Sequence, residues 1–285
     1  MISGTRYRLT LEINRQLSLA RDIERAQTEI STGKRVQAPS DDPVGAARIS
    51  EIAKAQAAAT AWKANLDLAY ALAARADSTL ASVGADVARA HELMLAGANG
   101  TMSAENRATV ALELRALADD IASLRDTRDA RGDLLFPSGQ VLEMPVNIGV
   151  SITATDTREA VFESVPVTSG PTDLVAIIRA AADALVEPNP ALRSAAITAS
   201  VDALAASSRH VAAVRGQQGA RANRIDNMVE RLAESGLQLD EERSAIESAD
   251  VTAVVARLQS RQLTLEAAQA VFSRVNQSTL FDVLR

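Results

Sequence analysis

The feature that most constrains this chain is a narrow apolar seam at each of its two ends. The N-terminal seam consists of Leu9, Ile13, Leu17, Ala20, Ile23 and Ile30. The C-terminal seam repeats on steps of three and four residues and consists of Val254, Leu258, Leu265, Ala268, Phe272 and Val275. Seams of this width are typical of coiled-coil helices, and no nearby segment completes either one. We therefore expect the two ends to pair with each other or with neighbouring subunits.

The composition favours long, closely packed helices. Aromatic residues make up only 2% of the 285 residues, so the apolar 47% consists mostly of small aliphatic side chains, and glycine and proline are few. These properties predict a mainly α fold: a long-helix bundle with paired N- and C-terminal coiled-coil helices and a small β-rich insertion. The net charge of −6 argues against a nucleic-acid partner, which requires a basic surface.

The chain contains no cysteine, which excludes disulfides, thiolate metal sites and thiol nucleophiles. Its N-terminus lacks the apolar core and cleavage site of a secretory signal, and no apolar run approaches the roughly 20 residues of a membrane span. These observations predict a soluble protein without a membrane partner. A cytoplasmic location follows unless the chain is exported without a cleaved signal peptide.

A strong helix start follows the first predicted helix, which covers residues 5–31. It consists of Ser40, Asp41, Asp42 and Pro43. A capping side chain, two carboxylates at the positive end of the helix dipole and proline in the first turn all favour a helix here. We expect this helix to run to about residue 96. Paired carboxylates could alternatively bind a metal ion or perform acid–base chemistry, but helix capping accounts for both of them.

The remaining elements follow from turn residues and periodicity. Residues 97–101 form a turn that leads into a helix capped by Ser103, which makes an antiparallel hairpin. We expect Leu66, Leu72 and Leu80 of the long helix to face Leu114, Leu117 and Ile121 of the next one. Glycine and proline interrupt residues 131–170, where strict alternation predicts a strand at 147–154 with a partner at 160–167. Further helices are predicted at 172–186 and 191–246.

Few side chains of this sequence are suited to catalysis or metal binding. His91 and His210 are the only imidazoles, and they lie far apart without the spacing of metal ligands. We therefore predict no catalytic, cofactor-binding or metal-binding residues and no cofactor, and the chain is not expected to be an enzyme. An enzyme would require a polar pocket within the bundle.

Several sequence stretches resemble those of the bacterial flagellin and hook-associated protein family. They are ISTGKRV at 30–36 with PSDDPV at 39–44, RAHEL at 89–93 with NGT at 99–101, DLLFPSG at 133–139, GARANRI at 219–225, and FSRV at 272–275 with LFDVL at 280–284. Within that family the combination is most similar to the hook–filament junction proteins. The matches cover both terminal thirds of the chain in order, and the middle does not match in detail.

The resemblance implies a domain organisation. Residues 1–38 and 250–285 would form a terminal coiled-coil domain for inner assembly, and residues 39–131 and 171–249 a helical bundle core. Residues 132–170 would form a small β-rich outer domain. The assembly interface would include Leu9, Ile13, Leu17, Val254, Leu258, Leu265, Phe272 and Val275.

The resemblance also implies a function. The chain would be a structural subunit of the flagellum, a hook-associated junction protein that links hook to filament by self-assembly through its terminal helices. Its partners would be further copies, the hook-side junction protein, flagellin and an export chaperone. It would lie outside the cell on the flagellum, exported through the flagellar type III channel without a cleaved signal peptide. The alternatives are flagellin itself and, in a different class, a cytoplasmic coiled-coil adaptor.

Overall fold

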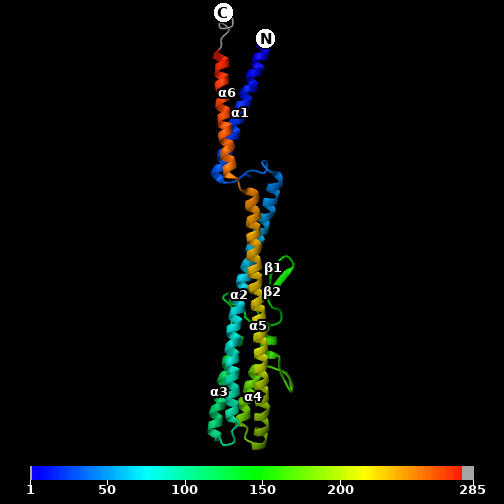
Figure 1. Cartoon of the computed structure of the whole chain (residues 1–285). Coiled ribbons are helices and arrows are strands. Elements are labelled where there is room, and N and C mark those ends of the chain that lie inside the picture. Colours follow the sequence, from blue (N-terminus) through cyan, green and yellow to red (C-terminus); the bar gives the residue numbers. More distant parts are fainter. Residues whose placement is uncertain (1, 278–285) are drawn as a thin grey trace, which may run out of the picture. The chain divides into compact units, whose positions relative to one another are not determined.

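A computed structural model describes residues 2–277, with the side chains of residue 7 and of residues 10–274. Within this range the helices are α1 (Ile2–Thr32), α2 (Pro43–Gly97), α3 (Ala104–Arg125), α4 (Leu174–Val186), α5 (Pro190–Glu247) and α6 (Val251–Gln277), as labelled in Figure 1. The strands are β1 (Glu143–Asn147), β2 (Val150–Thr153), β3 (Val165–Val167) and β4 (Gly170–Thr172). The predicted mainly α fold with a small β insertion is confirmed.

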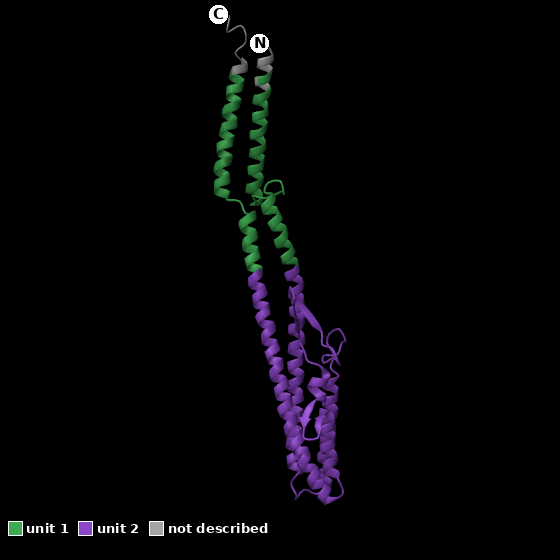
Figure 2. Cartoon of the chain, turned by 90° about the vertical axis from the view of Figure 1, so that its right-hand side faces the viewer, with its two compact units in different colours: residues 1–57, 236–285 green, residues 58–235 purple. Residues whose placement is uncertain are grey.

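The chain divides into two compact units, which Figure 2 distinguishes by colour. Unit 1 contains Met1–Ala57 and Gly236–Arg285, and unit 2 contains Ala58–Ser235. The long helices α2 and α5 each contribute one part to each unit.

The core of unit 2 is a helical bundle with an apolar interior. Leu80 of α2, Leu114 and Ile121 of α3 and Ile178 of α4 are at most 1% exposed and belong to one cluster with Val211 of α5. Side-chain caps begin two of these helices: Ser103 Oγ accepts a hydrogen bond from Asn106 N at α3, and Asp173 Oδ1 accepts one from Ala176 N at α4. The caps satisfy backbone donors that a helix start otherwise leaves unpaired.

Two phenylalanines attach the segment after α3 to the bundle. Phe136 and Phe162 are fully buried, and their rings meet edge to face with centroids 5.5 Å apart and an interplanar angle of 78°. Phe162 lies in η1 (Glu159–Glu163), a short π-helical turn. Because aromatic side chains bury large apolar areas, this pair stabilises an otherwise irregular segment.

The predicted strand pairing of the insertion is wrong. A strand at 147–154 with a partner at 160–167 is replaced by two hairpins, in which β1 pairs with β2 and β3 pairs with β4. The first turn lies inside the predicted strand, because Gly149 adopts a positive φ of 69° that reverses the chain. The predicted alternation places Ile148 on the apolar face of the strand, but it is 87% exposed at this turn. Ile152 and Ala154, on the same predicted face, are buried.

The first hairpin packs on the bundle through a second apolar cluster. Leu66, Ala69 and Ala73 of α2 pack with Ile225 of α5 and with the hairpin residues Met144, Val146, Ile152 and Ala154. The expectation that Leu66 faces α3 is therefore wrong, because the hairpin occupies that position. Buried Gln218 of α5 strengthens the attachment, since its Nε2 donates to Ala154 O at 2.8 Å.

Candidate assembly interface

The terminal helices α1 and α6 lie side by side and run antiparallel in unit 1 (Figures 1 and 2). Among their described side chains, the most buried apolar residues are Ala26 and Val254, each 3% exposed, which lie near the end of α1 and the beginning of α6. Further along the pair, Ile23 and Leu258 are only partly buried. The pair therefore has a small apolar contact that is concentrated at its base.

The residues predicted for the assembly interface differ in exposure. Val254 is buried, and Leu258, Leu265 and Phe272 are partly buried. Ile13 and Leu17 are 42% and 49% exposed. Leu9 and Val275 lie within the terminal helices, but their side chains are outside the described residues. Ile13 and Leu17, the described side chains of α1 predicted for assembly, are thus accessible in the single chain.

Sequence reasoning missed several exposed apolar residues next to these seams. Leu11 is 54% exposed, Leu263 69% and Val271 62%. They are not members of the two predicted seams, and their only signal in the sequence is their apolar side chain. Together with Ile13 and Leu17 they give the terminal pair more apolar surface than its own packing covers.

Two ion pairs connect the terminal helices. Asp22 of α1 pairs with Arg261 of α6, and Glu29 pairs with Arg257, with Oε2 and Nη1 3.9 Å apart. Their order along the chain follows the antiparallel arrangement. Glu29 is only 7% exposed, so its carboxylate lies between the two helices and not on their outer surface.

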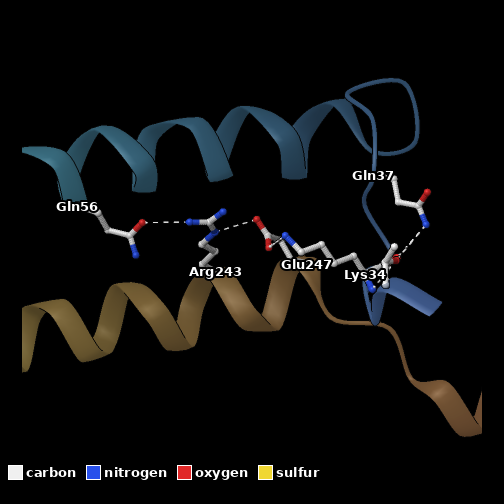
Figure 3. A network of polar contacts seen from close by, with 6 residues as sticks. Lys34, Gln37, Gln56, Arg243 and Glu247 are labelled. Atoms are coloured by element: carbon white, nitrogen blue, oxygen red, sulfur yellow. Dashed lines mark hydrogen bonds and ion pairs between the residues drawn. The ribbon is translucent and has the colours of Figure 1, made fainter. Parts of the chain in front are cut away.

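The two linkers that join the terminal helices to the long helices are bound to each other. Lys34 and Ser248 form an isolated antiparallel bridge, in which Arg35 N donates to Glu247 O at 2.7 Å and Ala249 N donates to Gly33 O at 2.9 Å. Side chains extend the contact, as Figure 3 shows. The Glu247 carboxylate binds Lys34 Nζ at 2.9 Å and Arg243 Nε at 2.8 Å.

Helix α2 begins at Pro43 with the acidic pair at its start. Asp42 Oδ1 accepts from Gly45 N at 2.9 Å, and Asp41 Oδ2 accepts from Ala38 N at 2.9 Å. These backbone donors lower the pKa of both carboxyl groups, helped at Asp42 by the guanidinium of Arg35. Ser40 is exposed in the preceding turn. Asp42 therefore accepts from an N–H group in the first turn of α2, whereas Asp41 accepts from N–H groups of the preceding loop and does not cap the helix.

The pH dependence of this region follows from Glu247. Its hydrogen bonds with Lys34 and Arg243 lower the pKa of its carboxyl group from 4.5. A lowered folded-state pKa stabilises the fold above the unfolded value, and this contribution is lost as pH falls through the folded value. We expect thermal unfolding to show a lower Tm for Glu247→Gln than for the native chain at pH 7. The difference should shrink below pH 4.5, and a difference that persists unchanged in acid would contradict this assignment.

The described residues contain no cluster of three or more His, Asp or Glu side chains that could hold a metal ion. His210 Nε2 lies 3.1 Å from Val161 O, a contact that packs it against η1 in unit 2. None of the described helices has an apolar stretch long enough to cross a membrane. The groove beside the linkers is lined mainly by small and apolar side chains, including Val36, Pro39 and Ile49.

Comparison with known protein families gives two matches. Residues 10–139 match the N-terminal helical region of bacterial flagellin, and residues 201–284 match its C-terminal helical region. Among curated proteins, the flagellar hook-associated protein 3 of Escherichia coli is 23% identical over 90% of both chains. The flagellin of Listeria monocytogenes is 23% identical over 90% of this chain and 89% of its own length.

Solved structures share the fold. A putative flagellar hook-associated protein from Vibrio parahaemolyticus matches with a TM-score of 0.65 and 20% identity over 73% of this chain and all of its own. The flagellar junction protein FlgL from Legionella pneumophila matches with a TM-score of 0.58 and 13% identity, over 72% of this chain and all of its own. At these identities the structures show a common fold, and the family matches extend the likeness to both ends of the sequence.

Proposed function

This chain belongs to the bacterial flagellin family and is a hook-associated structural protein of the flagellum, and we propose that its paired terminal helices join the hook to the filament. The family is structural and non-enzymatic.

The observation that carries the proposal is the uncovered apolar surface of α1 and α6. Ile13, Leu17, Leu263 and Val271 are each at least 42% exposed on a helix pair whose buried contact is small. Apolar side chains gathered on one helix pair favour association with another protein surface. The partners that we propose are neighbouring copies of this chain, the hook-side junction protein and flagellin.

We propose a separate role for each of the three domains predicted from the sequence. Residues 1–38 and 250–285 would make the inner contacts, residues 39–131 and 171–249 would form the supporting bundle, and residues 132–170 would face outward. Export would proceed through the flagellar channel with a chaperone and without a cleaved signal peptide. The second candidate, a filament subunit, rests on the flagellin match, and the two roles differ in where the protein lies on the flagellum.

Truncation tests the role of the terminal helices. We expect a chain ending at residue 249 to keep the unit 2 bundle folded, because that core lies within residues 58–235. Cells that carry only this version should build hooks without filaments and release flagellin into the medium. Restoration by the full-length chain is the control, and filaments of normal number with the truncated chain would overturn the proposal.

A further inference from the structure

We propose that the contacts between the two linkers set the register of α1 against α6, so that the terminal helices are positioned from their base. We call these contacts the linker clasp and define it as residues 33–35 and 246–249. The proposal concerns unit 1 of the isolated chain and does not depend on the junction role.

The linker clasp completes the end of helix α5. The last carbonyls of a helix have no partner within it. Here Arg35 N donates to Glu247 O at 2.7 Å and Arg35 Nη2 donates to Ile246 O at 3.1 Å. By contrast, α1 caps itself, because Gly33 has a φ of 68° and its N donates to Glu29 O. The end of α5 therefore depends on a linker more than 200 residues away in the sequence.

Charge strengthens this dependence. Glu247 lies at the C-terminus of α5, where a carboxylate is unfavourable because the helix dipole is negative there. Lys34 Nζ at 2.9 Å and Arg243 Nε at 2.8 Å compensate it, and Arg243 Nη1 continues to Gln56 Oε1 at 3.3 Å (Figure 3). The Glu247 side chain is 14% exposed, so water screens these contacts only partly.

The start of α6 follows directly from the linker clasp. Ala249 N is bonded to Gly33 O, and Asp250 caps the helix, since its Oδ1 accepts from Ala253 N at 3.1 Å. Only a few residues separate the bridge from the first turn of α6, so its first residues have little freedom relative to the end of α1. Closing the clasp thus places Val254 beside the last turns of α1.

The helices themselves specify their register weakly. The contact includes the small residues Ala26 and Ala268, which make shallow contacts compared with leucine or isoleucine. Gln16 adds a buried Nε2 without a hydrogen-bond partner among the described residues. The pair between Glu29 and Arg257 is long, at 3.9 Å, and the Arg257 side chain is 52% exposed. The pair between Arg261 and Asp22 joins side chains that are 35% and 36% exposed, so water screens both ion pairs and each adds little. The linker clasp differs from these contacts because it combines two backbone hydrogen bonds with a mostly buried, ion-paired carboxylate.

The test compares Glu247→Gln with Glu241→Gln, a matched control on an exposed residue of the same helix. In the first arm, trypsin cleavage after Lys34 and Arg35 reports an open linker clasp. We expect cleavage there to be about fivefold faster in Glu247→Gln than in the control, because charged hydrogen bonds to a mostly buried carboxylate are lost. Equal rates in the two variants would show that Glu247 does not hold the linkers.

The second arm measures register and separates positioning from general stability. Since the chain lacks cysteine, Gln27→Cys and Gln269→Cys accept spin labels selectively. Gln269 lies about 22 Å along α6 from Val254, and slippage by one turn changes the distance between labels by about 5 Å. We expect one narrow distance in the Glu241→Gln background and a second, shifted population with Glu247→Gln. A single unchanged distance in both backgrounds would overturn the proposal, even if trypsin cleavage increases.

Discussion

Replacing Leu114 with alanine is expected to lower the free energy of unfolding of unit 2 by about 3 kcal/mol, since large-to-small changes in a closed core remove packing and leave a cavity. Leu114 is 0% exposed and belongs to the same cluster as Leu80, Ile121 and Val211. A core of this size should show a fall in Tm of about 6–12 °C.

The matched control for this prediction is Leu112→Ala on the same helix. Leu112 is 64% exposed, so its truncation should change the free energy of unfolding by less than about 0.5 kcal/mol. Denaturant titrations followed by circular dichroism distinguish the two variants. If the two substitutions have equal effects, the assignment of Leu114 to the bundle core is wrong.

The second large effect is expected for Phe272→Asp, which should prevent filament attachment and leave the single chain folded. Phe272 is partly buried on α6, outside the bundle of unit 2. A carboxylate at this position would be desolvated wherever a neighbouring chain covers it, at a cost of about 3 kcal/mol per copy or more. The cost recurs at every subunit of the assembly, so its effect on assembly greatly exceeds its effect on the monomer.

Gln269→Asp provides the control, because it adds the same charge at an exposed position one turn earlier on α6. We expect cells with Phe272→Asp to bear hooks without filaments, and cells with Gln269→Asp to swim. Circular dichroism of both purified variants should match that of the native chain. Normal filaments on Phe272→Asp cells would exclude this face of α6 from assembly.

The long helices were predictable because their signals are local. Ser103 and the stretch from Ser40 to Pro43 mark helix starts close to the observed ones. The helical spacing of apolar residues identifies the core-facing leucines. The β-rich insertion is harder to predict. Ile148 is apolar and continues an alternating pattern, so the pattern predicts one long strand and gives no sign of the turn at Gly149.

The sequence predicts only part of the candidate interface, for a different physical reason. A periodic seam identifies residues that suit a helix–helix contact, but it does not say which of them the chain covers itself and which it leaves exposed. Leu263 and Val271 lie outside the seam and were missed. Likewise, Lys34 and Glu247 resemble ordinary surface charges, and only the folded chain brings them to 2.9 Å.

Localisation on the flagellum tests the central claim most directly. An epitope inserted at the exposed turn beside Ile148, in the proposed outer segment, keeps the terminal helices intact for assembly. Gold-labelled electron microscopy of flagella from cells that express this chain should then show label in one narrow band where the hook meets the filament. Label distributed along the whole filament would identify a filament subunit instead, and label confined to the cell interior would contradict a flagellar role altogether.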